Sequence, residues 1–329
     1  MKQNIILCGG LGFVGFHTAQ KLQATKNYNV IIVDAERQYI KYLTKENPYK
    51  RRKNLLNNCT FYNLDCNDKE LLSDVFIKHK PDFLIHFAAL PIVWKAEQCQ
   101  NIAQKDILNS FKSVLETLEE NQIKTKKIIY ISSSMVYGNF QRDTEDRLIP
   151  AVENQPTKPN DIYGKYKLLC EDELKRYAKN NAVNFNIIRP SAVYGPEDYN
   201  LRVVEIFISN AIQNKNIILS EDGSLKLDFT YVEDLAIGII QCMELGKNNE
   251  TYNLTLGKGY SIRELAQMVK NRFPNVEIVN GLLEAERKNR TFLDITKAKN
   301  DFGFNPKTDL ESGLNSYIDY IISNSTYNE

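Results

Sequence analysis

The sequence predicts an α/β fold with a doubly wound parallel sheet. Three observations predict it. Short apolar segments of strand length alternate with longer amphipathic segments over residues 1–190, a glycine-rich loop directly follows the first apolar segment, and polar residues follow several of the others. Continuous apolar strands separated by helices are typical of a parallel sheet covered on both faces. Ligands of such sheets bind at the carboxyl ends of the strands.

Composition limits the possible functions. The chain has 329 residues, of which 43% are hydrophobic, so it can bury a large core in one or two domains. Its net charge is +1, which gives no field that would attract nucleic acid or an anionic membrane. The six cysteines show neither Cys-x-x-Cys pairs nor metal-ligand spacing with the three histidines. With no signal peptide or apolar run of spanning length, we expect a cytoplasmic protein with reduced thiols and no metal.

The first strand is predicted at Gln3 to Cys8. It leads into GGLGFVG, in which Gly9, Gly12 and Gly15 are followed by a helical pattern from Val14 to Ala24. Glycine is needed here for a tight turn, for close approach of backbone N–H groups to a pyrophosphate, and for packing of helix against strand.

A second apolar strand, Val30 to Val33, ends at Asp34, about 20 residues after the glycine-rich loop. A carboxylate at this position binds the adenosine ribose hydroxyls and repels a 2′-phosphate. The order strand, loop, helix, strand, acid therefore predicts a Rossmann dinucleotide site that prefers NAD to NADP. Arg37 is close enough in sequence to leave NADP open.

The alternation continues along the chain. Strands are predicted at Thr60 to Leu64, Phe83 to Phe87 and Ile128 to Ile131, and helices at Asp68 to His79 and Asn101 to Glu119.

Two residues in this part carry competing interpretations. Asp65 ends its strand and could accept a hydrogen bond from the adenine amino group, although an Asx turn or helix cap before Asp68 explains it equally well. His86 lies inside an apolar strand, which favours a packed core histidine over a catalytic base.

A hydroxyl cluster and a Tyr-x-x-x-Lys pattern follow the strand at Ile128 to Ile131. Ser133 lies in SSSMVYG, and Tyr163 precedes Lys167 by four residues on a predicted helix, Asp161 to Lys179, so that both side chains share one helical face. A nearby ammonium favours the phenolate, which suits proton transfer. The pattern alone is weak evidence, since Tyr49 and Lys53 also fit it.

Several further motifs accompany these residues: HFAA at 86–89, RPSAVYGP at 189–196, LDFTYVEDLA at 227–236, YNL at 252–254 and DITKAKNDFGFNP at 294–306. With them the chain resembles extended short-chain dehydrogenases/reductases of the NAD-dependent epimerase/dehydratase family, most of which act on nucleotide sugars. The resemblance covers nearly the whole chain.

The resemblance implies roles for residues at matching positions. Ser133 would donate its hydroxyl proton to the substrate oxygen, Tyr163 would act as acid and base, and Lys167 would bind the nicotinamide ribose and lower the pKa of Tyr163. The expected NAD-binding residues are Gly9, Gly12, Phe13, Val14, Gly15, Asp34, Asp65, Cys66, Phe87, Ala88, Ala89, Tyr163, Lys167 and Pro190. A homodimer through the helices Asn101 to Glu119 and Asp161 to Lys179 is also implied.

We predict two domains. Residues 1–190 form the NAD-binding domain, and residues 191–329 form a smaller mixed α/β substrate-binding domain, of which 227–248 packs back on the first. No Gly/Ser linker separates them, so the site should lie in the cleft between them. Helices of the second part are predicted at Val203 to Asn214, Val232 to Leu245, Ser261 to Arg272 and Leu310 to Ile322, after a strand at Phe185 to Ile188.

The chain departs from the family pattern at three places. Ser134 and Met135 stand where dehydratases carry an Asp-Glu pair, which argues against 4,6-dehydration. Leu227 stands where many relatives place an arginine that binds the substrate diphosphate, and Glu-Ala-Glu-Arg at 284–287 replaces an Arg-Pro-Gly segment. Candidate replacement cations are Arg202, Arg287 and Arg290, although an arginine of this kind is more often a solvated surface charge. The predicted substrate-binding residues are Ser134, Tyr194, Arg202 and Arg287.

These observations predict an NAD-dependent oxidoreductase that acts at C4 of a nucleotide sugar, with a 4-epimerase as the first choice. A reductase of a 4-keto sugar or a C4 oxidase would use the same residues in one direction. A catalytically inactive dinucleotide sensor remains as an alternative of another class, although it would not need Ser133, Tyr163 and Lys167 together.

Overall fold

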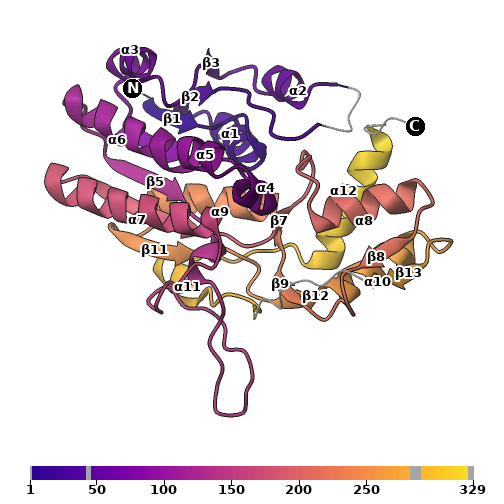
Figure 1. Ribbon diagram of the computed structural model, residues 1–329. Coiled ribbons are helices and arrows are strands. Elements are labelled where there is room, and N and C mark those ends of the chain that lie inside the picture. The colour runs from indigo at the N-terminus through magenta and orange to yellow at the C-terminus, as the bar shows by residue number, and fades with distance from the viewer. Residues whose placement is uncertain (1, 42–45, 282–289, 325–329) are drawn as a thin grey trace.

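The computed structural model describes residues 2–41, 46–281 and 290–324. Its centre is a seven-stranded sheet in the order β11-β6-β5-β4-β1-β2-β3, in which every neighbouring pair is parallel (Figure 1). The strands are β1 Gln3–Cys8, β2 Tyr28–Asp34, β3 Thr60–Asn63, β4 Phe83–His86, β5 Lys127–Ile131, β6 Asn184–Arg189 and β11 Glu250–Asn253. The predicted doubly wound α/β class is confirmed.

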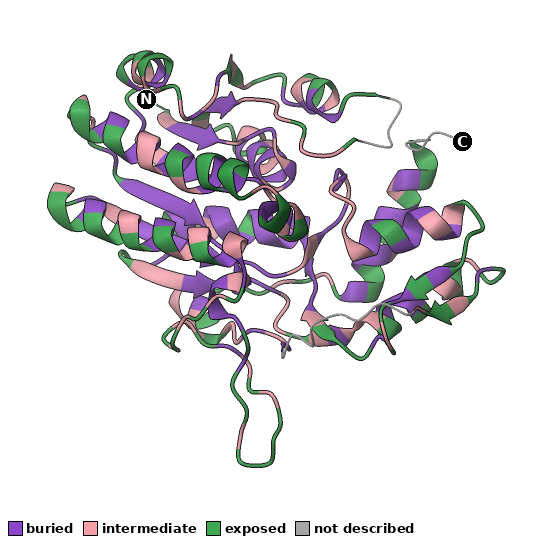
Figure 2. Ribbon diagram, in the orientation of Figure 1, coloured by how far each residue is buried: buried purple, intermediate pink, exposed green. Residues whose placement is uncertain are grey.

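Successive side chains of the strands enter two different hydrophobic clusters, as the period of two of a strand requires. In β1, Ile5 and Leu7 pack with helices α1 (Phe13–Thr25) and α9 (Val232–Leu245), whereas Ile6 and Cys8 face the opposite cluster. That opposite cluster contains side chains of α3 Lys69–His79, α6 Ser110–Glu120 and α7 Ile162–Asn181. Figure 2 shows the strands buried between helices whose outer faces are exposed.

The helix predicted at Asn101 to Glu119 is interrupted. The chain forms α5 (Gln100–Ala103), then a π-helical segment η1 (Gln104–Asn109), and only then α6. A π-helical turn shifts later residues around the axis without changing the apolar pattern, so this interruption could not be predicted from the sequence. Asp106 lies in this segment and faces the cavity described below. Helices α2 (Pro48–Leu55) and α4 (Val93–Gln98) were also not predicted.

A second lobe follows β6 and lies to the right in Figure 1. Its core joins α8 (Val203–Ile212), α10 (Ile262–Arg272) and α12 (Leu310–Ser323). Three two-stranded pairs border it: β7 Val193–Tyr194 with β10 Thr230–Tyr231, β9 Lys226–Asp228 with β12 Gly259–Ser261, and β8 Ile217–Leu219 with β13 Ile278–Asn280.

Parts of the chain after residue 190 belong structurally with the sheet. Helix α9 packs on α1, the strand β11 extends the sheet, and α11 (Thr296–Phe302) contributes Ala298 and Phe302 to the same cluster. The sheet therefore recruits residues beyond the segment 227–248, and the two-domain boundary stays a prediction. Among the described residues, no helix is both long and apolar enough to cross a bilayer.

Candidate active site

One cavity of about 370 Å³ lies at the carboxyl ends of the strands, between the sheet and the second lobe. All the predicted cofactor residues line it: Gly9, Gly12, Phe13, Val14, Gly15, Asp34, Asp65, Cys66, Phe87, Ala88, Ala89, Tyr163, Lys167 and Pro190. Ser133, Ser134, Arg202, Leu227 and Arg290 line it as well. The cofactor loop, the hydroxyl cluster and the second lobe thus share a single space.

The glycine-rich loop leaves no space for a side chain at Gly9 or at Gly15. A Cβ on Gly9, whose φ is +79°, would lie 2.5 Å from the Ala88 nitrogen, and a Cβ on Gly15 would lie 2.4 Å from the Gly9 oxygen. Gly12 is the N-cap residue of α1, so the second half of the glycine-rich motif, from Phe13 to Gly15, forms the first turn of that helix. The first amides of α1 therefore have a short, open approach from the cavity, which suits a dinucleotide pyrophosphate.

Asp34 ends β2 beside this loop and is 8% exposed. Its carboxylate accepts hydrogen bonds from the Leu11 nitrogen at 2.9 Å and the Glu36 nitrogen at 2.8 Å. Burial raises its pKa, and these two amide donors oppose that shift. Asp34 thus fixes the glycine-rich loop as well as facing the site where an adenosine ribose would bind.

Arg37, which left NADP open in the sequence, is occupied by two carboxylates. It donates to Asp65 Oδ2 at 2.5 Å and forms an ion pair with Asp106. Asp65 Oδ1 in turn accepts from both the backbone and the side-chain nitrogen of Asn67, so the Asx turn is present. Although burial raises the pKa of Asp65, the bonds from Asn67 and the charge of Arg37 lower it overall. Arg37 is therefore partly neutralised and poorly placed to attract a 2′-phosphate.

Ser133, Tyr163 and Lys167 meet at the carboxyl end of β5. The Lys167 nitrogen donates to the Ile131 carbonyl at 2.7 Å and lies 5.8 Å from the centre of the Tyr163 ring. Ser133 lies close enough to the Tyr163 phenol to lower its pKa, and the Ser133 Oγ accepts from the Met135 nitrogen at 3.1 Å. The three side chains thus come together as the spacing predicts.

Burial controls the protonation of this group. It raises the pKa of Tyr163 to about 12, against the opposing influence of the Arg202 charge and the Ser133 hydrogen bond. It also lowers the pKa of Lys167 to about 8. In the free protein the expected lowering of the Tyr163 pKa by Lys167 is therefore not reached, because the phenol is buried and the ammonium is directed to a backbone carbonyl.

His86 behaves as a packed core residue. Its ring lies 4.7 Å from that of Phe111 and is stacked on Tyr130 at 6.1 Å. Burial, together with the Lys167 charge, lowers its pKa to about 3, so the ring is neutral.

Arg202 enters the cavity from the second lobe. It forms an ion pair with Asp198 at 3.2 Å, and its guanidinium carbon lies 5.7 Å from the centre of the Phe13 ring in the glycine-rich loop. It stands at the N-cap of α8, but Glu205 in the first turn already binds the Leu201 nitrogen at 2.6 Å. A carboxylate therefore already occupies the start of this helix, whereas the Arg202 side chain is 31% exposed.

Arg290 is 7% exposed and approaches the hydroxyl cluster from the other side. Its Nη2 donates to Ser134 Oγ at 2.5 Å, its Nη1 contacts Met135 Sδ, and its guanidinium carbon lies 5.5 Å from the centre of the Phe140 ring. Burial lowers its pKa to about 10, which the more distant Asp161 and Asp228 oppose. The sequence placed Arg290 among three exchangeable arginines and could not single it out.

Two predicted substrate residues need separate comment. Tyr194 does not line the cavity: it is 1% exposed, and its hydroxyl donates to the carbonyls of Asp309 and Leu310. Its place in a short strand of the second lobe turns the ring into the core, so the substrate role predicted for it is wrong. Arg287 lies outside the described residues.

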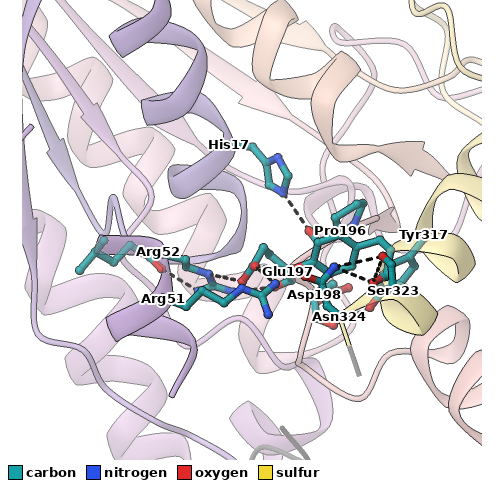
Figure 3. Close-up of polar contacts among 11 residues, drawn as sticks. His17, Arg51, Arg52, Pro196, Glu197, Asp198, Tyr317, Ser323 and Asn324 are labelled. Carbon is teal, nitrogen blue, oxygen red and sulfur yellow. Dashed lines mark hydrogen bonds and ion pairs between the residues drawn. The ribbon is translucent and has the colours of Figure 1, made fainter. Parts of the chain in front are cut away.

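The sequence also missed a set of contacts that joins the two lobes beside the glycine-rich loop (Figure 3). Arg52 of α2 donates to the Leu11 carbonyl at 2.7 Å, to the Glu197 carbonyl at 2.5 Å and to Glu197 Oε2 at 3.1 Å. The His17 ring donates to the Pro196 carbonyl at 2.8 Å, and Arg51 pairs with Glu197. Arg52 lies in the basic run KRRK, which is typical of a solvated helix, so nothing in the sequence indicated its burial.

Comparison with known proteins agrees with this geometry. The family model described as "NAD dependent epimerase/dehydratase family" matches residues 5–255. A Methanocaldococcus jannaschii protein described as a candidate UDP-glucose 4-epimerase is 31% identical over 98% of this chain and 99% of its own length. The UDP-glucose 4-epimerase of Thermotoga maritima, solved with UDP-glucose, is 27% identical with a TM-score of 0.87, covering 98% of this chain and 100% of that one.

A second solved structure is the UDP-glucuronic acid 4-epimerase of Bacillus cereus in complex with UDP-glucuronic acid and NAD. It is 25% identical with a TM-score of 0.85 and covers 98% of this chain and 99% of that one. Fold, cavity and relatives point the same way, so the chain belongs to the NAD dependent epimerase/dehydratase family and is an NAD-dependent enzyme.

Proposed function

We propose that the enzyme interconverts C4 epimers of a UDP-linked sugar. The observation that carries the proposal is the meeting of Ser133, Tyr163 and Lys167 in the cavity that also contains the glycine-rich loop. Proton-transfer groups beside a dinucleotide site are what oxidation of a secondary alcohol requires. The relatives named for UDP-sugar 4-epimerisation support UDP as the nucleotide.

In this mechanism Tyr163 takes the proton of the C4 hydroxyl while Ser133 donates a hydrogen bond to the same oxygen. Bound NAD⁺ supplies the hydride acceptor at C4, and the charge of its ring favours the phenolate. Tyr163 needs that help, because burial raises its pKa to about 12. Lys167 would bind the nicotinamide ribose. After the ketone has turned, the hydride would return to the other face of C4, and Tyr163 would return the proton to the oxygen.

The side chains that follow Ser133 favour this chemistry over elimination. Ser134 and Met135 provide neither a carboxylic acid nor a carboxylate, and Ser134 is bonded to Arg290. Loss of water from the sugar would need an acid and a base there. We therefore place 4,6-dehydration last among the reactions of the family.

A 4-keto-sugar reductase or a C4 oxidase is the second candidate, because the same three residues would serve it. The two differ in the fate of the cofactor. An epimerase keeps NADH through the ketone stage, so it should carry NAD(H) through purification and interconvert UDP-glucose and UDP-galactose, or UDP-glucuronic acid and its C4 epimer, without added nicotinamide. NMR of the products with absorbance at the NADH band tests this directly. Stoichiometric NADH consumption with no exchange at C4 would reject the epimerase in favour of the reductase.

Two further expectations rest on the family resemblance. One is a homodimer, which would pair α7 and the helical segment of α5 to α6 with their copies. Helix α7 does present Leu169 to solvent, 46% exposed, on a face that such a dimer could cover. Size-exclusion chromatography with light scattering tests the dimer. The other expectation is a cytoplasmic location.

A further inference from the structure

Arg290 is a buried cation that has no counter-ion in the part of the chain that the structure describes. Among the described residues, no carboxylate lies within ion-pair distance of its guanidinium, whose near contacts are the Ser134 hydroxyl, the Met135 thioether and the Phe140 ring. A thioether is a weak acceptor, and an aromatic face replaces only part of the hydration that burial removes. A buried charge left in this state is unfavourable unless a ligand completes it.

Among the described residues, the two carboxylates whose charge acts on Arg290, Asp161 and Asp228, hold backbone amides. Asp161 accepts from the Gly164 nitrogen at the start of α7, at 2.8 Å. Asp228 accepts from the nitrogens of Leu293 and Gly257, at 3.0 and 3.2 Å. Turning either carboxylate toward Arg290 would disturb these amide bonds, and Asp228 Oδ1, which has no hydrogen-bond partner among the described residues, is not within ion-pair distance of the guanidinium. The guanidinium therefore has N–H donors available for a group in the cavity.

Arg290 lies next to the reacting position rather than across the sugar from it. Ser134, which Arg290 contacts, directly follows Ser133, and Ser133 lines the cavity together with Tyr163. If C4 lies at Ser133 and Tyr163, the ring carbons closest to Arg290 are the neighbours of C4, namely C3 and C5. The diphosphate is attached to C1, on the opposite side of the ring. Arg202 lies against Phe13, the first residue of α1, and forms an ion pair with Asp198, so it enters the cavity at a different place from Arg290.

We propose that Arg290 and Ser134 form a subsite for a carboxylate that the sugar carries on a carbon next to C4, so that the preferred substrate is an acidic UDP-sugar. The inference rests on the proposed function, because it places C4 at Tyr163. A guanidinium offers two parallel donors to a carboxylate, and the Ser134 hydroxyl, which accepts from Arg290, still has a proton to donate. A neutral hydroxymethyl group would leave the charge uncompensated.

Two arrangements supply such a carboxylate. In a hexuronic acid it is attached to C5, and in a muramic acid it belongs to the lactyl group at C3. Titration calorimetry on the NAD-loaded enzyme would compare UDP-glucuronic acid and UDP-N-acetylmuramic acid with UDP-glucose and with UDP alone. We expect one of the acids to bind roughly tenfold or more tightly than UDP-glucose, in line with a charge-assisted hydrogen-bonded pair. The identity of that acid assigns the carboxylate to C5 or C3.

Arg290→Met removes the charge while keeping a long apolar side chain, and Arg290→Lys keeps the charge but not the planar pair of donors. We expect the ratio of affinities, acid over UDP-glucose, to fall roughly tenfold in Arg290→Met and by less in Arg290→Lys. Arg147→Met, which changes an arginine 69% exposed and bonded to Asp143, is the matched control and should leave the ratio unchanged.

Three outcomes would overturn the inference. Equal wild-type affinity for UDP-glucose and both acids would do so without any variant, even if Arg290→Met failed to fold. The inference would also be overturned if the ratio of affinities, acid over UDP-glucose, were unchanged in Arg290→Met. Weakening of UDP itself by as much as the acid would move Arg290 to the diphosphate. Failure of the proposed function has a separate readout, since NMR would then show no exchange of C4 epimers for any of the sugars, whatever their affinities.

Discussion

The two ends of the cavity are built differently. At the cofactor end, polar groups are paired before any ligand arrives: Asp34 holds two backbone amides, and Arg37 is shared by Asp65 and Asp106. At the sugar end, burial disfavours the charged form of Tyr163, Lys167 and Arg290 alike. Polar groups that are already paired hold the cofactor end in one arrangement. Buried groups with shifted pKa values, as at the sugar end, are typical of a catalytic or ligand-binding site.

The largest effect should come from the sugar end. Tyr163→Phe keeps the ring and removes the acid and base, so kcat should fall on the order of 10²-fold or more, the usual worth of a positioned proton-transfer group. Affinity for NAD should stay nearly intact, because the cofactor end is formed by other groups. Steady-state rates and NAD titration measure both quantities.

Tyr166→Phe, on the same helix, is the control and should retain normal turnover. Near-normal turnover of Tyr163→Phe on a confirmed substrate would remove the basis of the mechanism and, with it, the contrast between the two ends.

A smaller effect is expected where the two ends meet. If Arg202 binds the substrate diphosphate, its contact is as strong in the ground state as in the transition state, so Arg202→Ala should raise KM roughly tenfold with kcat little changed. The wild-type KM should also rise more steeply with ionic strength than that of the variant. Arg176→Ala, which alters an exposed arginine of α7, supplies the control. A large fall in kcat with an unchanged KM would show that Arg202 acts on Tyr163 instead.

At the cofactor end, Asp34→Ala should narrow the preference for NAD over NADP by several-fold, because a carboxylate no longer faces the 2′ position. The substitution should also lower the affinity for both cofactors, since the Leu11 amide loses its acceptor and the glycine-rich loop is less firmly held. Asp34→Asn retains an acceptor oxygen and should separate the two contributions. Fluorescence titrations with NADH and NADPH measure them. A wild type that prefers NADPH would contradict the assignment.

The smallest effect concerns stability. Burial raises the pKa of Asp228 from an ordinary value of 3.8 to about 7, so the folded protein binds this proton more tightly than the unfolded chain does. The resulting stabilisation is complete below pH 3.8 and is lost as the pH rises through about 7. The stability of the wild type relative to Asp228→Asn should therefore be greater near pH 5 than near pH 8 in urea unfolding. A difference independent of pH would show that Asp228 is ionised throughout.

The same contrast explains what the sequence could predict. Cofactor-end residues such as Gly9, Gly15 and Asp34 are fixed by local backbone geometry within one strand-loop-helix-strand unit, and spacing along the chain reveals that geometry. Arg52 and Arg290 reach the cavity through long side chains from distant segments, and their neighbours in sequence resemble ordinary surface. The pattern could not distinguish them from solvated arginines, and it assigned Tyr194 to the substrate although that ring is buried in the second lobe.

Arg52 connects the two lobes at one side of the cavity. A single guanidinium binds the Leu11 carbonyl in the glycine-rich loop and the carbonyl and carboxylate of Glu197 in the second lobe, and the Tyr320 hydroxyl holds the same carboxylate at 2.5 Å. Separation of the lobes at this point would break these bonds together and leave a buried charge unpaired. These bonds therefore oppose separation of the lobes beside the glycine-rich loop, which is the part of the cavity expected to hold the cofactor.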